Sequence, residues 1–196
     1  MHSRWSVAMG LVLFLAVVSS QVSAQETDTD FTGVIQKLKV YAPEDHQDAA
    51  YLGLQGMKGK VPLSQIKAEV LIVEIFSMYC PFCQKHAPDA NKLYQAIDSR
   101  REFRDKIKMI GIGVGNSPFE VGIFKKKYSP PFPLFDDRDA AVANSFSGLR
   151  TPHYLGIRSK NANLEIFYSE SGGFSDPEEF LKMMVKESGI QRGGSR

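Results

Sequence analysis

The chain contains two cysteines, Cys80 and Cys83, which are three positions apart and directly follow an apolar segment. That segment, 70–76, reads V-L-I-V-E-I-F and predicts a strand covered on both faces of a sheet. Pro81 suits the first turn of a helix, where a missing N–H leaves no bond unmade. The sequence therefore predicts a strand that leads into a helix, with both cysteines at the junction.

This junction favours thiol chemistry. The partial positive charge at a helix N-terminus stabilises a thiolate, which is the attacking species in disulfide exchange. Cys83 lies one helical turn after Cys80 on the same face, so the two sulfur atoms can reach each other. Cys80 is the candidate nucleophile and Cys83 the candidate resolving cysteine.

Other uses of a cysteine pair remain open. A structural disulfide at this spacing would close a very small loop and would stabilise the fold little. A zinc site needs two further ligands, and the histidines are scattered along the chain. A copper carrier that uses both sulfur atoms and His153 fits the preference of copper for soft ligands.

Residues 1–24 have the layout of a secretory signal peptide. Arg4 gives a positive start, 7–18 is an apolar run with one glycine, and V-S-A at 22–24 suits a signal peptidase. A bilayer span needs about 20 apolar residues, so this run is short for an anchor, although an uncleaved anchor is the alternative. We expect export, which permits disulfide chemistry, and no stable membrane insertion after cleavage.

The remaining sequence predicts a flexible lead-in at 25–40, one domain at 41–190 and a tail at 191–196. Strands are expected at 51–54, 70–76, 108–115, 132–135, 149–157 and 164–168, and helices at 81–103, 117–128, 139–146 and 175–188. Pro88 should kink the first of these helices. Alternating strands and helices favour an α/β sheet with parallel pairs, and the final strand–strand–helix order favours an antiparallel edge.

Composition excludes some functions. The net charge is +2, which gives no electrostatic footprint for nucleic acid. Three lysines at 125–127 are interpreted as the solvated end of a helix. The glycines at 111–115 lack the dinucleotide-binding spacing and are interpreted as strand-end and turn glycines.

From about Pro62 to Gly189 the chain resembles the thioredoxin-fold thiol–disulfide oxidoreductases. The resemblance is carried by an ordered set of motifs: C-P-F-C at the strand–helix junction, Pro88 in the helix, Glu74 six residues before Cys80, the pair Thr151-Pro152 in the place of the family's cis-proline, and Gly172-Gly173 before the last helix. It implies a central mixed β-sheet flanked by helices.

The branch that the sequence resembles most is the TlpA/ResA group. The helix at 117–128 and the segment F-P-L-F-D-D at 132–137 are similar to the extra helix–strand unit of that group and its peroxiredoxin relatives. The peroxiredoxin motif P-x-x-x-T-x-x-C is absent. Tyr79 stands where the TlpA group commonly has tryptophan, and the local stretch is nearer to DsbA in style. The direction of the redox reaction therefore stays open.

The resemblance also implies roles for residues around the cysteines. Glu74, buried beneath Cys83, would have a raised pKa and could accept or relay the proton of the resolving thiol; a glutamate at the sheet edge is the alternative. A cis Pro152 would bring the backbone of Thr151 beside the cysteines and leave an edge open to a substrate strand. Phe82, with Pro81, would be an exposed contact for substrate.

The side chains that remain are interpreted as structural. His153 is expected to be a residue of its strand, and His86 to pack or to face solvent. The aromatic residues nearest to the expected site are interpreted as core: Phe76, Tyr79, Phe132 and Phe135.

The resulting expectation is an exported, periplasmic thiol–disulfide oxidoreductase with no metal or organic cofactor beyond the Cys80–Cys83 pair. Its partners would be protein thiols and disulfides and a membrane redox partner. Reduction of protein disulfides is favoured, in the setting of cytochrome c or copper-oxidase maturation that the resemblance implies. A DsbA-like oxidant and a copper carrier that includes His153 are the alternatives.

Overall fold

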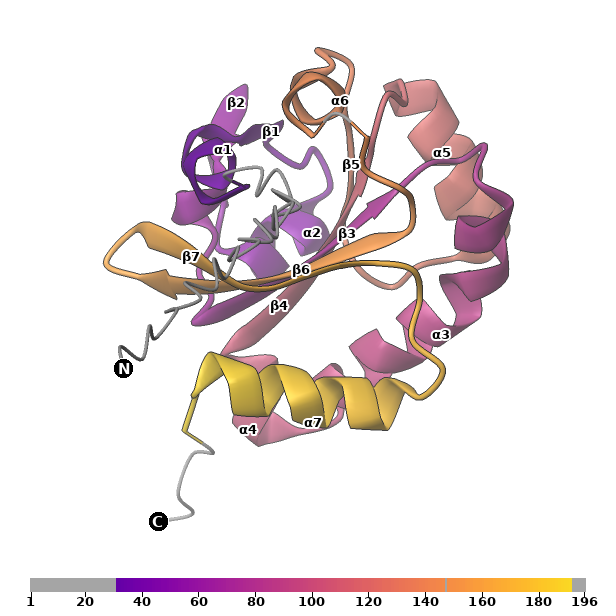
Figure 1. Ribbon diagram of the computed structural model, residues 1–196. Helices are drawn as coiled ribbons and strands as arrows, with labels where there is room; N and C mark the ends of the chain where they lie inside the picture. The colour runs from indigo at the N-terminus through magenta and orange to yellow at the C-terminus, as the bar shows by residue number, and fades with distance from the viewer. Residues whose placement is uncertain (1–30, 147, 192–196) are drawn as a thin grey trace, which may run out of the picture.

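The computed structural model describes residues 31–146 and 148–191 (Figure 1). The predicted signal segment at 1–24, residues 25–30 of the lead-in and residues 192–196 of the tail lie outside this part of the chain. Within it, no helix has the length and apolar character needed to cross a bilayer.

A five-stranded mixed sheet forms the centre, in the order β5–β4–β3–β6–β7. Strands β3 (Val70–Phe76), β4 (Ile107–Gly113) and β5 (Leu134–Asp136) are parallel, while β6 (His153–Lys160) and β7 (Asn163–Ser171) form the antiparallel side. All of β3 is buried, because it is central and covered on both faces. The mixed sheet with an antiparallel edge matches the expectation.

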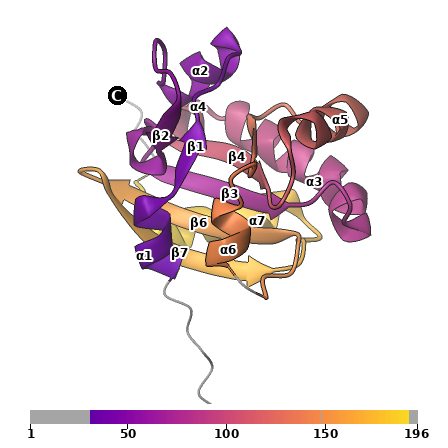
Figure 2. The same ribbon diagram turned by 90° about the horizontal axis from the view of Figure 1, so that it is seen from above.

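One face of the sheet is covered by α3 (Pro81–Asp98), the short α4 (Arg101–Arg104) and α7 (Pro177–Ser188) (Figures 1 and 2). Helix α5 (Pro118–Tyr128) packs beside α3 and β5, so the expected extra helix–strand unit is present. The other face is covered by α1 (Phe31–Lys37), α6 (Ala141–Ser145) and the hairpin of β1 (Lys39–Tyr41) and β2 (Lys60–Pro62), with the 3₁₀ turn η1 (Leu63–Gln65).

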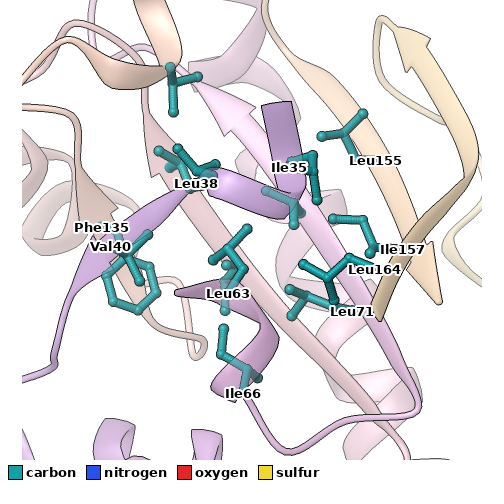
Figure 3. Packing of buried hydrophobic residues seen from close by; sticks show 14 of the residues in the cluster. Ile35, Leu38, Val40, Leu63, Ile66, Leu71, Phe135, Leu155, Ile157 and Leu164 are labelled. Carbon is teal, nitrogen blue, oxygen red and sulfur yellow. The ribbon is translucent and has the colours of Figure 1, made fainter. Parts of the chain in front are cut away.

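The predicted flexible lead-in is wrong for the described residues 31–40, which form α1 and β1. Ile35, Leu38 and Val40 are buried among the side chains of the second sheet face (Figure 3). Gln36 also donates a hydrogen bond of 2.6 Å to the carbonyl of Leu164 in β7. This apolar face must be covered, so the segment belongs to the domain, which begins before residue 41.

The strand predicted at 51–54 is also wrong, because this region is the helix α2 (His46–Leu52). The Asp45 side chain caps it by accepting from the N–H groups of Gln47 and Asp48, and Gly53 ends it with a left-handed φ of 69°. The helix predicted over 81–103 is α3, which is shorter than expected and ends at Asp98. The other predicted elements are present, with ends displaced by a few residues.

Candidate functional site

Cys80 and Cys83 lie at the start of α3 with Cys80 as the N-cap, and both are free thiols. The Cys80 Sγ accepts a hydrogen bond from the Cys83 N–H and donates one to the Thr151 carbonyl, each at 3.2 Å. Cys83 is fully buried, whereas Cys80 is partly exposed. Only Cys80 is therefore open to a large partner.

The two thiols differ in acidity. Burial acts to raise the pKa of Cys80, but hydrogen bonds from the side chains of Cys83 and Thr151 and from the N–H groups of Cys83 and Phe82 outweigh it and hold the pKa below its ordinary value. Burial, followed by the neighbouring Cys80, raises the pKa of Cys83 to about 12. Of the two thiols, Cys80 therefore loses its proton first, and Cys83 keeps its proton at neutral pH.

The loop before Cys80 is held by two amide side chains. The Met78 N–H donates to Asn116 Oδ1, and Gln84 Nε2 donates to the Met78 carbonyl, both at 2.8 Å. Asn116 is buried, and a Cβ on Gly113 would come within 3.1 Å of its Oδ1. Asn116 was not among the site residues predicted from the sequence. The available signal was a polar residue directly after a glycine-rich strand end with no nucleotide-binding spacing.

The peptide bond between Thr151 and Pro152 is cis, as the resemblance implied. The Gly172 N–H donates to the Pro152 carbonyl at 2.7 Å, so the glycine turn after β7 supports this loop. A Cβ on Gly173 would lie 2.6 Å from Nδ1 of His86 on α3. The predicted glycine turn therefore allows the chain to approach both Pro152 and α3.

Glu74 is only 2% exposed and lies in the central strand, so the sheet-edge alternative is wrong. Burial raises its pKa to about 7, as predicted in direction, and the Tyr154 hydroxyl acts weakly against this. Tyr154 is the register partner of Glu74 on β6, and the charges of both Glu74 and Cys83 act on it. Neither Glu74 Oε1 nor the Tyr154 hydroxyl has a hydrogen-bond partner among the described residues.

The two histidines discussed from the sequence are structural. His86 is buried, and its ring packs edge-on against Tyr154 and Phe174 at centroid distances of 5.6 Å and 4.5 Å. His153 lies on β6, where its ring nitrogens contact the hydroxyls of Ser171 and Ser169 at 2.9 Å and 3.0 Å. No three His, Cys, Asp or Glu side chains within 31–146 and 148–191 are grouped to hold a metal ion.

Exposed aromatic side chains flank Cys80. Phe82 is 72% exposed, as expected, but Tyr79, predicted to be core, is 65% exposed. The turn before α3 directs Tyr79 outward, and its hydroxyl donates to Glu120 on α5. Phe119, also on α5, is 77% exposed. The other three aromatic residues predicted to be core are buried: Phe76, Phe132 and Phe135.

A cavity of about 490 Å³ opens beside the cysteines. Its lining includes Phe82, Lys85, His86, Arg150, Pro152 and Phe174. Phe82 and Thr151 were predicted from the sequence as contacts for substrate, and Pro152 as a catalytic residue, whereas Lys85 and Arg150 in the same cavity were not predicted. No local pattern marks these two residues, because their proximity depends on how α3 packs near the loop before β6.

The chain matches the profile of a known protein family. The profile of the AhpC/TSA family matches residues 46–162. The chain is similar to the thiol–disulfide oxidoreductase ResA of Halalkalibacterium halodurans, with 22% identity over 146 residues that cover 72% of this chain and 78% of that protein.

Solved structures give the same fold. StoA from Bacillus subtilis shares 21% identity at a TM-score of 0.50, over 67% of this chain and 91% of StoA. A secreted Mycobacterium tuberculosis disulfide oxidoreductase homologous to Escherichia coli DsbE shares 13% identity at a TM-score of 0.54, over 78% of this chain and 97% of that chain. These likenesses confirm the expected thioredoxin fold.

Proposed function

The chain belongs to the AhpC/TSA family, and from this premise we propose that it is a thiol–disulfide oxidoreductase of the ResA and DsbE type. The observation that carries the proposal is the asymmetry of the cysteine pair. Cys80 is accessible, at a helix N-terminus and with a lowered pKa, while Cys83 is buried with a pKa of about 12. This arrangement suits one attacking and one resolving thiol.

The exchange follows from this asymmetry. The Cys80 thiolate attacks a substrate disulfide, forms a mixed disulfide and releases one substrate thiolate. Cys83 then loses its proton and attacks the Cys80 Sγ, which releases the second substrate thiolate. The products are the Cys80–Cys83 disulfide and a reduced substrate that has gained two electrons. No metal or organic cofactor takes part in these steps.

The second step needs a proton acceptor, because a thiol with a pKa of about 12 is almost entirely protonated at neutral pH. Glu74 has a pKa of about 7, which suits acceptance of a proton near neutral pH. Tyr154 is the register partner of Glu74, and the negative charges of both Glu74 and Cys83 act to raise the pKa of Tyr154. We therefore assign to Glu74 the role of accepting the Cys83 proton, directly or through water.

Substrate binding uses the surface beside Cys80. The Thr151 carbonyl already contacts the Cys80 Sγ, and Pro152 offers no N–H, so an extended substrate segment can lie along this loop. Exposed Pro81 and Phe82 line the other side of the reactive sulfur. The substrate class is protein thiols and disulfides.

We assign the reducing direction to this enzyme, in the periplasm, with electrons supplied by a membrane redox partner. The support is the signal-like segment at 1–24, the TlpA/ResA-like motifs and the similarity to ResA. The opposite, DsbA-like direction is favoured by one observation, the lowered pKa of Cys80, because a stabilised thiolate favours the reduced enzyme and makes its disulfide more oxidising. A copper carrier has less support, since His153 bonds to two serines instead.

The reduction potential of the Cys80–Cys83 pair, measured by equilibration with a thiol buffer, separates the two directions. A value of about −270 mV or lower supports a reductant, and a value near about −120 mV supports an oxidant. Turnover of insulin disulfides tests the activity itself. The Cys80→Ser variant should lose it, and the Cys83→Ser variant should accumulate mixed disulfide. Undiminished turnover by Cys80→Ser would contradict the proposed function.

A further inference from the structure

The cavity beside the cysteines carries positive charge that the protein does not neutralise. Lys85 and Arg150 line it, both are exposed, and neither has an ion pair or hydrogen bond with another described residue. Asp89, the carboxylate in the lining, already binds Lys92 Nζ at 2.8 Å. The cavity therefore presents two unpaired cations to a ligand.

A third polar group lies in the same cavity wall. His86 is buried, and its Nε2 has no hydrogen-bond partner in the described part of the chain. Burial lowers its pKa, so at neutral pH its ring is uncharged and has one nitrogen that donates and one that accepts. Contacts with Tyr154 and Phe174 hold the ring in place.

The cavity adjoins the reactive sulfur. Thr151 and Pro152 form part of its lining, and the Thr151 carbonyl lies 3.2 Å from the Cys80 Sγ. Phe82 and Phe174 add apolar walls. Its volume of about 490 Å³ can hold a side chain of a partner but not a folded element.

We propose that this cavity receives an aspartate or glutamate side chain of the substrate protein, two residues away from the substrate cysteine. The proposal rests on the proposed function, because it concerns the substrate of the same site. In an extended segment, side chains two residues apart project to the same side, about 6–7 Å from each other. When the substrate cysteine faces Cys80, such a neighbour reaches Lys85 and Arg150. Arginine suits a carboxylate because its planar group can donate two parallel hydrogen bonds.

The test compares two short peptides, each with one cysteine held as a disulfide with a chromogenic aromatic thiol. One carries aspartate two positions before and two positions after the cysteine, and the other carries asparagine there. The reduced enzyme attacks the peptide sulfur and releases the chromogenic thiolate, which is followed by stopped-flow absorbance. For exposed charge pairs we expect the aspartate peptide to react about three- to fivefold faster at low ionic strength.

Variants that remove charges test whether the preference for the aspartate peptide comes from the cavity. In the double variant Lys85→Gln/Arg150→Gln the rate ratio of the two peptides should fall to about one, as it should for the unchanged enzyme at about 1 M salt, where charges are screened. The matched control is Lys126→Gln/Arg101→Gln, which removes the same two charges from exposed positions outside the cavity lining. It should keep the ratio of the unchanged enzyme. The salt titration keeps the test valid if the double variant folds poorly.

The possible negative results distinguish the proposed specificity from the proposed function. Equal rates for the two peptides with the unchanged enzyme, or loss of the preference in the control variant, would overturn the proposed acidic specificity and leave the proposed function standing. No release of the chromogenic thiolate from either peptide would overturn the proposed function, and the specificity with it.

Discussion

Glu74 and Tyr154 are register partners across β3 and β6, and Glu74 Oε1 and the Tyr154 hydroxyl are both buried without a hydrogen-bond partner among the described residues. A buried polar group without a hydrogen-bond partner costs about 1–3 kcal/mol of stability. Two such groups side by side are therefore unusual in a folded protein and indicate a functional role. The Tyr154 ring also contacts His86, whose Nε2 is unpartnered too and which lines the substrate cavity. Tyr154 therefore lies between the buried Glu74 carboxyl and His86 at the cavity.

Glu74→Gln should change how the second step of exchange depends on pH. In the unchanged enzyme, resolution of a mixed disulfide should accelerate as Glu74 ionises around its pKa of about 7. Glutamine cannot accept a proton, so the variant should be slower at neutral pH by about 10²-fold or more. Stopped-flow decay of a preformed mixed disulfide across pH measures this. Superimposable profiles for the two proteins would remove Glu74 from the proton path.

The same variant should change how stability depends on pH. The Glu74 pKa is about 7 in the folded state against an ordinary value of 4.5, so the folded state holds this proton more tightly. The resulting stabilisation is fully present below about pH 4.5 and is lost as pH rises through about 7, and it amounts to about 3 kcal/mol. Urea unfolding of the reduced proteins should show this loss only with Glu74 present. A difference between the two proteins that does not vary with pH would mean that the pKa of Glu74 is not raised.

Tyr154→Phe should cost little stability, because the hydroxyl that it removes makes no hydrogen bond within the described residues. We expect the free energy of unfolding to change by less than about 1 kcal/mol.

The matched control for Tyr154→Phe is Tyr51→Phe. The Tyr51 hydroxyl accepts a hydrogen bond of 2.8 Å from the Met109 N–H, so its removal should cost about 1–3 kcal/mol. Equal losses of stability in the two variants would show that the Tyr154 hydroxyl does have a partner.

Alkylation of the reduced protein with iodoacetamide should modify Cys80 far ahead of Cys83. Cys83 is buried, and with a pKa of about 12 its thiolate is only about one part in 10⁵ at pH 7. Peptide mass spectrometry after a brief exposure identifies the modified thiol, and the urea-unfolded protein, in which both should react alike, is the control. Modification of Cys83 first would reverse the assigned roles.

Gly173→Ala should destabilise the protein, because the new Cβ would lie 2.6 Å from Nδ1 of buried His86. We expect a loss of about 1–3 kcal/mol in urea unfolding, the usual cost of overpacking. Gly122→Ala is the matched control, since Gly122 lies inside α5 with no other atom within 4 Å of its Cβ position. That change should stabilise the helix by about 0.5–1 kcal/mol. A neutral Gly173→Ala would show that the turn can move away from α3.

Of the two wrong predictions of secondary structure, one had a local sequence signal against it and the other did not. The helix α2 has local signals at both ends, in Asp45 and Gly53, that favour a helix over the predicted strand. The segment 31–40 has no such signal. Its burial follows from the apolar sheet face that it covers, which consists of residues far along the chain, among them Leu155 and Leu164.

The parts of the site that depend on neighbours in the chain could be predicted from local sequence patterns. Cys80 and Cys83 stand at the start of a helix because of the apolar strand before them and Pro81 between them. Glu74 is buried because every other residue of its strand is apolar.

The surroundings of these residues depend instead on contacts between elements that are distant in the chain. Tyr154 meets Glu74 through the register of β6 on β3, and a shift of one residue would turn its side chain to the opposite face of the sheet. Lys85 and Arg150 share a cavity because α3 packs near the loop before β6. Such contacts join residues some 65 to 80 positions apart, and they depend on the packing of whole elements, which no local pattern of side chains encodes.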